Sequence, residues 1–253
     1  MTATATRQVE HLDDDFPLLD MDRTKPWVIA AFGKKGSGKS VFSRSIYRSW
    51  PGDKVCIDVN GNAGPGEDAE AVTAEQARAG RWPTKAVPLG ERPRPRNLHY
   101  RAQPTSATYR EDLDRAVGLA LYPQDHPVLI WAGECGELMP NGRPGPHMNA
   151  LLQQNRHHRA AVLFDGPRPV WVSPYVLLQA DLVAVYRLPQ ISDRKRIAEC
   201  IGVETATFER VCRETWRTDP HAFVLCDMTS PETTLWQCPP LPLDGVDTKG
   251  AAT

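Results

Sequence analysis

The residues with the clearest chemical meaning are eight consecutive ones, 33–40, with the sequence GKKGSGKS. They match the pattern G-x-x-x-x-G-K-[ST], in which successive backbone N–H groups surround the phosphates of a nucleotide. Glycine lacks a Cβ, so such a loop can turn tightly and aim its N–H groups inward. The pattern predicts a phosphate-binding loop, or P-loop, whose nucleotide-binding residues are Gly33, Lys34, Lys35, Gly36, Ser37, Gly38, Lys39, Ser40 and, directly after it, Val41.

Two side chains of this loop have predicted roles of their own. Lys39 can reach the β- and γ-phosphates of ATP, and the Ser40 hydroxyl can ligate Mg²⁺. The N-terminus of the following helix would add about half a positive charge, which favours the β-phosphate. We therefore expect ATP and Mg²⁺ as ligands, Lys39 as a catalytic residue and Ser40 as a metal ligand.

The segments on either side of the loop supply the setting that this chemistry requires. Residues 27–32, WVIAAF, form an apolar run typical of a buried parallel strand. Residues 41–48 follow with the pattern of a helix. Because all motif positions and both flanking elements agree, a chance glycine-rich loop is the weaker interpretation.

Further apolar runs alternate with helical patterns along the rest of the chain. This alternation predicts an α/β fold with a mainly parallel sheet and helices on both faces, and a nucleotide at the C-terminal ends of the strands. The expected strands after the first are residues 54–59, 97–101, 127–132, 160–164, 181–187 and 222–226.

The domain organisation expected from composition is one P-loop ATPase domain over residues 25–238. Residues 1–24 would form a flexible or loosely docked arm, and residues 239–253 a disordered tail. An irregular insertion rich in proline would occupy residues 61–97, with a short helix at 73–79. Thr73 would cap that helix.

Composition excludes several other classes of protein. No apolar run approaches the roughly 20 residues that span a bilayer, and the N-terminus lacks the pattern of a secretory signal, so we expect a cytoplasmic protein with no membrane-spanning segment. Six cysteines without a C-x-x-C pair argue against a zinc site or a disulfide framework. The net charge of −1 argues against electrostatic nucleic-acid binding by the whole surface. Local basic clusters remain at 92–96, 156–159 and 194–196.

Hydrolysis would need a carboxylate on the metal side and a residue that orients water. Such groups are expected after a later apolar strand, and residues 128–138, VLIWAGECGEL, are the candidate Walker B segment. This segment resembles the hhhhDE-x-x-x-L segment of the FtsK/HerA superfamily. Three further stretches continue the resemblance, in particular to Zot-like and phage DNA-packaging members: the basic stretch 156–159, the sensor-like stretch 162–169 and the strand-like stretch 180–188.

The resemblance covers roughly residues 26–200 and implies a RecA-like (ASCE) ATPase, usually a hexameric ring, that pumps DNA or extrudes phage. Double-stranded DNA is the expected partner. If the roles of the family residues apply at the matching positions of this chain, Glu134 would polarise the attacking water. Arg159 would supply an arginine finger to a neighbouring subunit, with Arg156 and Arg187 as alternatives. The other interpretations remain open: Glu134 as a surface acid, and the basic stretch 156–159 as a helix C-terminus that complements the helix dipole.

The chain departs from the superfamily pattern at two positions. Gly133 stands where the Walker B aspartate is expected, and Gly166 stands where a sensor glutamine is expected. Mg²⁺ binding would then rest on Ser40 with Asp58 or Asp165. Asp58, at the end of the second strand, is the preferred metal ligand, although a turn-forming role is equally compatible with its position.

Three functions compete at this level. The first is an ATP-driven motor that moves or packages DNA. The second, favoured by Gly133, is an ATP-binding assembly or switch subunit with weak or no hydrolysis. The third is a small-molecule kinase, for which the basic residues 92–101 would be a lid; the segments after residue 128 do not suit it.

Overall fold

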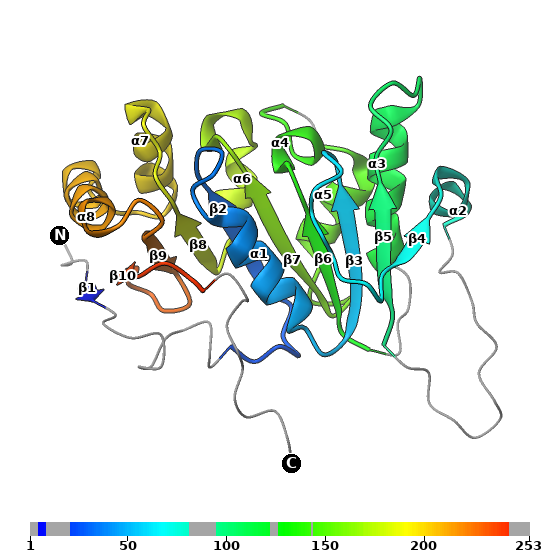
Figure 1. Ribbon diagram of the computed structural model, residues 1–253, viewed down its shortest axis with the longest axis horizontal. Helices are drawn as coiled ribbons and strands as arrows, with labels where there is room; N and C mark the ends of the chain where they lie inside the picture. The colour runs from blue at the N-terminus through cyan, green and yellow to red at the C-terminus, as the bar shows by residue number, and fades with distance from the viewer. Residues whose placement is uncertain (1–4, 9–20, 81–94, 122–125, 143, 243–253) are drawn as a thin grey trace, which may run out of the picture.

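Ten strands form a single sheet at the centre of the computed structural model (Figure 1), which describes residues 5–8, 21–80, 95–121, 126–142 and 144–242. The strand order is β1-β10-β9-β8-β2-β7-β6-β3-β5-β4. Their bounds are β1 Ala5–Gln8, β2 Val28–Phe32, β3 Asp53–Asp58, β4 Glu70–Val72, β5 Asn97–Arg101, β6 Val128–Ala132, β7 Ala160–Gly166, β8 Leu182–Val185, β9 Phe223–Asp227 and β10 Thr234–Cys238.

Pairing in the sheet is parallel except around β9, which runs antiparallel to both β8 and β10. The six strands from β8 to β5, with β2 and β7 among them, are all mutually parallel. The predicted mainly parallel α/β sheet is therefore confirmed.

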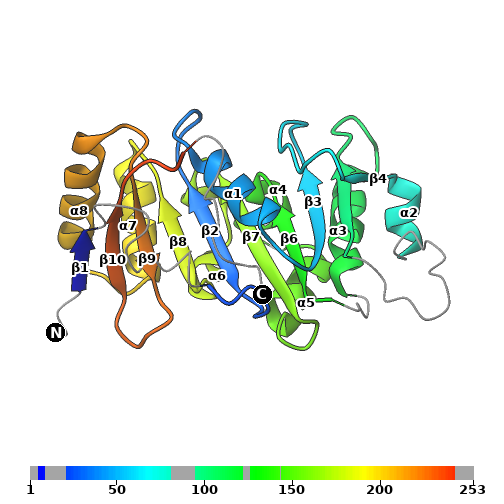
Figure 2. The same cartoon turned by 60° about the horizontal axis from the view of Figure 1, so that its bottom comes forward.

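Helices cover both faces of the sheet, as predicted. Alternate side chains of β2 show how: Val28, Ala30 and Phe32 enter one apolar cluster, and Ile29 and Ala31 enter the other. The first cluster contains residues of α3, α5 and α8, and the second contains residues of α1, which lies alone in front of the sheet in Figure 2. The helices are α1 Lys39–Arg48, α2 Ala74–Ala79, α3 Tyr109–Gly118, α4 Cys135–Leu138, α5 Pro146–Gln154, α6 Pro174–Leu178, α7 Ile191–Cys200 and α8 Thr205–Thr218.

Because β2, β6, β7 and β8 are parallel, their carboxyl ends meet at one edge of the sheet, at the top of Figure 1. The P-loop follows β2 at this edge. Glu134 follows β6, Asp165 ends β7 together with Gly166, and Tyr186 follows β8. The fold thus gathers segments more than 100 residues apart around one loop.

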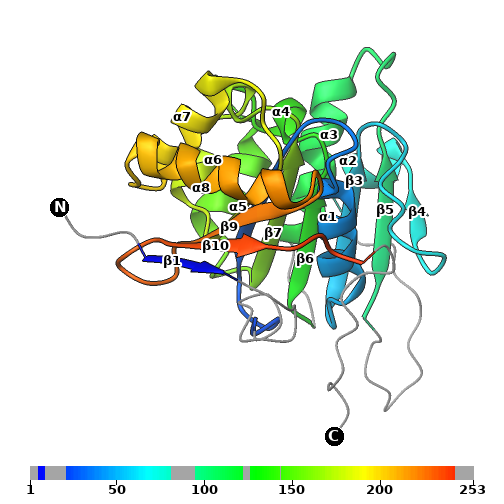
Figure 3. The same cartoon turned by 60° about the vertical axis from the view of Figure 1, so that its left-hand side comes forward.

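Three short strands lie outside the predicted pattern: β1, β10 and β4, the last within the expected insertion. β1 falls within residues 1–24, expected as a flexible or loosely docked arm, and pairs in parallel with β10. β10 lies next to β9, and β1 forms the edge of the sheet beyond β10 (Figure 3). β10 was not predicted, because its sequence TLWQC mixes polar and apolar residues. In the described part of the chain, no helix has the length and apolarity needed to cross a membrane.

The expected insertion at 61–97 contains β4 and α2. Thr73 accepts a hydrogen bond from the Gln76 N–H, and Gln76 accepts one from the Thr73 N–H, so α2 begins with the predicted cap. Residues 81–94 of the insertion and 243–253 of the expected tail lie outside the described residues. Leu241, also in the expected tail, packs against the apolar cluster under α1.

Candidate nucleotide-binding site

The conformation of the P-loop accounts for all three of its glycines. Gly36 and Gly38 adopt φ angles of 77° and 105°, in the left-handed region that favours glycine. Gly33 has a different constraint, because a Cβ there would lie 2.5 Å from the Cβ of Tyr186. A residue with a side chain would therefore be unfavourable at all three positions: at Gly33 because of the contact with Tyr186, and at Gly36 and Gly38 because of the backbone conformation.

Hydrogen bonds to two neighbouring strands hold the loop in place. The Gly33 N–H donates to the Gly166 carbonyl at 3.3 Å, and the Lys34 N–H donates to the Arg187 carbonyl at 3.2 Å. Within the described residues, several other N–H groups of the loop have no backbone acceptor, and no side chain caps α1. Free N–H groups and the helix dipole together suit an anion. These groups belong to Lys35, Gly36, Gly38, Lys39 and Ser40.

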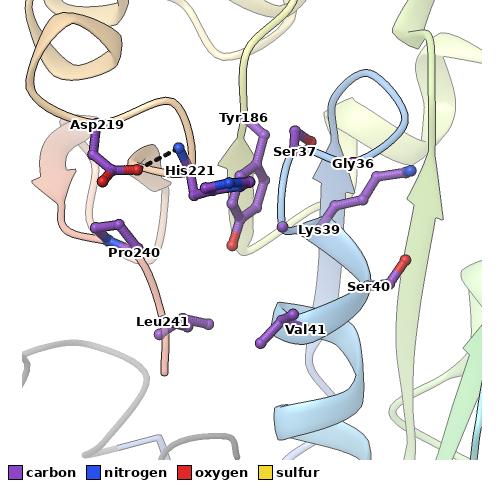
Figure 4. Close-up of a pocket in the computed structure, with 11 residues that line it drawn as sticks. Gly36, Ser37, Lys39, Ser40, Val41, Tyr186, Asp219, His221, Pro240 and Leu241 are labelled. Carbon is purple, nitrogen blue, oxygen red and sulfur yellow. Dashed lines mark hydrogen bonds between the residues drawn. The ribbon is translucent and has the colours of Figure 1, made fainter. Parts of the chain in front are cut away.

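The Lys39 side chain is largely buried and faces two acidic groups. Its charge lowers the pKa values of Glu134 and Asp165, although burial raises both pKa values more strongly. Figure 4 shows the side chains of Lys39 and Ser40 pointing away from Tyr186. The loop thus presents its lysine and serine on the side where β7 and β6 end.

Glu134 sits in a strained position directly after β6, with φ 52°. Its N–H donates to Asp165 Oδ1 at 3.1 Å, and its Oε1 accepts a hydrogen bond from Asn60 Nδ2 at 2.9 Å. Burial and the neighbouring Asp165 raise the pKa of its carboxyl group. Glu134 is half-buried and hydrogen-bonded to Asn60 and Asp165, so its surroundings differ from those of a free surface acid.

Asp165 lies beside Gly133, the position at which a Walker B aspartate is expected from the sequence. A Cβ on Gly133 would lie 3.9 Å from Asp165 Oδ1. Asp165 is 6% exposed, and Oδ2 accepts a hydrogen bond from Trp131 Nε1 at 3.0 Å. β6 and β7 pair with Ala132 opposite Phe164, so the next residue of each strand stands side by side. The neighbouring strand thus supplies a carboxylate where β6 lacks one.

Asp58, the expected metal ligand, accepts hydrogen bonds within a turn in this structure. Oδ1 accepts the N–H groups of Gly61 and Asn62, at 2.7 and 3.1 Å. Oδ2 accepts the Ala63 N–H and lies 3.3 Å from His99 Nε2. Both oxygens therefore stabilise the turn after β3, the alternative that the sequence left open.

The expected sensor position carries no side chain, and the structure leaves no room for one. A Cβ on Gly166 would lie 2.9 Å from Cys135 Sγ, while the Gly166 carbonyl anchors the P-loop. The polar amide that does reach the site is Asn60, which sequence reasoning missed. The available signal was its place just after β3, whose neighbour in the sheet is β6.

Arg159 lies at the opposite edge of the sheet from Lys39. It precedes β7 with φ 50°, and its carbonyl accepts the Val128 N–H at the start of β6. Arg156 lies near the same edge, in the α5–β7 connection. Arg187 instead follows β8 at the P-loop edge and is exposed. The chain itself therefore does not bring Arg159 to its own P-loop.

A parallel sheet with this loop at its carboxyl edge defines the fold of a P-loop NTPase. No family model and no curated protein matches the sequence. The genome packaging NTPase B204 of Sulfolobus turreted icosahedral virus 2, solved with ATP-gammaS, has a TM-score of 0.64 at 15% identity, over 88% of this chain and 100% of that chain. The DNA-packaging ATPase B204 of Sulfolobus turreted icosahedral virus has a TM-score of 0.61 at 15% identity, over 87% and 100%. The predicted P-loop NTPase fold is thus confirmed.

Proposed function

We propose that this protein is an ATPase that couples ATP hydrolysis to the movement or packaging of double-stranded DNA. The observation that carries the proposal is the placement of Lys39 between a free phosphate cradle and the carboxylates of Glu134 and Asp165. The fold shared with packaging NTPases supports the choice of DNA as the moved substrate. ATP and Mg²⁺ are the proposed ligands.

The residues of the site have separate roles in the proposed hydrolysis of ATP. The P-loop N–H groups and Lys39 hold the β- and γ-phosphates. Glu134 orients the attacking water. These roles require only groups that the described chain brings to one edge of the sheet.

The donor set suits magnesium. Mg²⁺ prefers oxygen ligands, and the Ser40 hydroxyl and the Asp165 carboxylate are oxygen donors near the lysine. When bound, the ion would neutralise part of the phosphate charge. We assign Asp165, in place of Asp58, as the metal-side carboxylate, acting directly or through water.

A ring of subunits, with six as the expected number, would complete the site. Arg159 is exposed at the edge of the sheet opposite its own P-loop, so its proposed role as an arginine finger requires a second copy. Arg187 lies nearer to its own phosphate cradle and is the alternative.

A second function, an ATP-binding switch or assembly subunit with little hydrolysis, is favoured by one hydrogen bond. Asn60 holds Glu134 at 2.9 Å, and Gly166 provides no sensor side chain. If this contact persists with nucleotide bound, Glu134 would not reach water.

Steady-state hydrolysis of ATP with and without double-stranded DNA separates the two functions. The motor predicts turnover that rises with DNA and falls about 100-fold or more in Glu134→Gln, because the water-orienting group is lost. Glu137→Gln, an exposed acid three residues further on, is the matched control and should keep wild-type turnover. Tight ATP binding with no turnover would favour the switch. Phosphate transfer to a small-molecule acceptor would contradict both.

A further inference from the structure

Helices α7 and α8 form a pair that the nucleotide site does not use. The turn at 201–204 joins them, and its Gly202 has φ 71°, in the left-handed region that favours glycine. Across this turn the Val203 N–H donates to the Ala198 carbonyl at 3.0 Å, and α8 then runs in a new direction (Figure 3). Two helices joined by a tight turn that contains glycine are the arrangement of a helix-turn-helix.

Buried contacts make the pair a rigid unit. Its two helices contact each other and place apolar residues in the same core cluster. The Arg194 guanidinium donates to the Leu188 carbonyl at 2.8 Å and lies 3.3 Å from Glu209 Oε1, so it connects α7 to α8. Of the basic cluster 194–196, Arg194 is thus used inside the pair. The buried apolar residues of the pair are Ile197, Ala198, Ile201, Val203, Phe208 and Val211.

The outer face of α8 carries a stripe of arginines. The buried residues of this helix lie between Phe208 and Thr215 and face the core. Because an α-helix has about 3.6 residues per turn, positions 206, 210, 213 and 217 lie along one line on the opposite side. These exposed positions hold Ala206, Arg210, Arg213 and Arg217.

The acidic residues of α8 balance only part of this charge. Arg210 lies 3.5 Å from Glu214, one turn further on. Glu209 faces inward to Arg194 and is only partly exposed. Within the described residues, neither Arg213 nor Arg217 has an ion pair. The stripe therefore presents positive charge, which suits a polyanion.

The position of α8 leaves this stripe accessible. The helix packs against β9 and β10 and lies at the end of the molecule opposite α2 in both Figure 1 and Figure 2. Asp219 follows α8 directly, and together with His221 it lines the hollow beside the first turn of α1 (Figure 4). The helix thus extends from an exposed basic face to the surroundings of the P-loop.

We propose that the α7–α8 pair docks duplex DNA, with α8 in the major groove. The major groove admits an α-helix, and a helix-turn-helix places its second helix there. Arg210, Arg213 and Arg217 contact phosphates along the groove, and the small side chain of Ala206 allows close approach. The inference rests on the proposed function, because it takes duplex DNA as the partner. It adds the surface that holds the DNA, outside the nucleotide site.

The test measures binding of the full chain to a fluorescently labelled DNA duplex by anisotropy, over a series of salt concentrations and without nucleotide. Arg213→Ala/Arg217→Ala should weaken binding about tenfold or more and reduce the slope of log affinity against log salt by about 2. Arg110→Ala/Arg115→Ala, which removes the same charge from exposed positions of α3, should stay within about threefold of wild type. Equal losses in the two double variants, or no loss in the α8 variant, would overturn the proposal.

A second variant tests the stripe without removing an arginine. Ala206→Glu places a carboxylate on the exposed line in the first turn of α8, where negative charge favours the helix, so the fold should be kept. It should weaken duplex binding about tenfold, because the carboxylate would face the phosphates. Ala107→Glu, at an exposed alanine before α3, is the matched control and should change nothing. Wild-type duplex affinity in a folded Ala206→Glu protein would contradict the docking of α8.

Lys39→Ala separates this surface from the nucleotide site, since it should lose ATP hydrolysis and still bind the duplex like wild type. If the wild-type protein binds no duplex, the DNA partner of the proposed function fails together with the surface. If wild type and the α8 variants bind the duplex equally well, the surface alone fails. Unchanged duplex affinity with lost self-association in the α8 variants would assign the stripe to a protein contact and overturn the proposal.

Discussion

At the scale of single residues, the most informative pair is Gly133 and Asp165. The carboxylate expected at position 133 is found instead on the neighbouring strand, at Asp165. Gly133, directly after β6, has no side chain, and the Asp165 carboxylate at the end of β7 lies beside it. The sequence showed both residues but not their contact, because the pairing of β6 with β7 follows from topology rather than from spacing along the chain. Asp58 was preferred for the same reason: its turn hydrogen bonds depend on the path of residues 61–63.

If Asp165 supplies the carboxylate that position 133 lacks, Mg²⁺ binding should depend on Asp165. Asp165→Asn should raise the Mg²⁺ concentration needed for half-maximal nucleotide binding by about tenfold, the loss of one charged ligand contact. Asp58→Asn should leave that concentration unchanged, because Asp58 serves a turn. The readout is nucleotide affinity during a Mg²⁺ titration, with thermal melting to verify folding. The reverse order of effects would return the metal role to Asp58.

Other residues were within reach of sequence reasoning. The P-loop from Gly33 to Ser40 has a rigid pattern and recognisable flanking elements, so its residues were predicted individually. Glu134 was assigned from the resemblance of residues 128–138 to a Walker B segment, and its role stays a prediction. Asn60 and Tyr186 were not predicted, because a lone polar residue after a strand has no distinctive spacing; only the neighbouring strands show what these side chains contact.

At the scale of elements, the helix α2 shows what local sequence can determine. Its start was predicted from Thr73 and Gln76 alone, and the reciprocal hydrogen bonds confirm it. β1 and β10 show the limit. Neither sequence is distinctly strand-like, and each is a strand because an exposed edge of the sheet offers it hydrogen bonds.

The cap of α2 supports a prediction about local stability. Thr73→Ala removes the acceptor for the Gln76 N–H and should destabilise the helix by about 1 kcal/mol. The measurement is hydrogen exchange, in which amides of α2 should exchange about fivefold faster. Amides of α8 are the internal control and should keep their rates. Equal acceleration in both helices would indicate global destabilisation, and no acceleration would contradict the role of the cap.

At the scale of the whole molecule, the proposed ring explains why Arg159 and Lys39 lie at opposite edges of one sheet. An arginine finger of one subunit can complete the ATP site of the neighbouring subunit, even though it cannot reach the P-loop of its own chain. The prediction is complementation. Arg159→Gln and Glu134→Gln should each be inactive alone, while a mixture should regain turnover, because some interfaces then join an intact site to an intact arginine.

Mixed ATPase assays, alongside sizing with and without ATP and Mg²⁺, measure this effect. Mixing Lys39→Ala with Glu134→Gln is the control and should regain nothing, since one subunit lacks the phosphate-binding lysine and the other lacks the water-orienting carboxylate. Failure of the Arg159→Gln mixture in an assembled ring would remove the finger role from Arg159. Arg187 would then be the residue to test.

The central claim is that residues 33–40 hold the phosphates of a nucleotide through free N–H groups and Lys39. Calorimetric titration of ATP into Lys39→Ala tests it most directly. Lys25→Ala is the control, because Lys25 is an exposed lysine before β2, at the opposite end of that strand from the loop. We predict that Lys39→Ala loses ATP binding by about 100-fold or more, while Lys25→Ala stays within about threefold of wild type. Wild-type ATP affinity in a folded Lys39→Ala protein would contradict the claim.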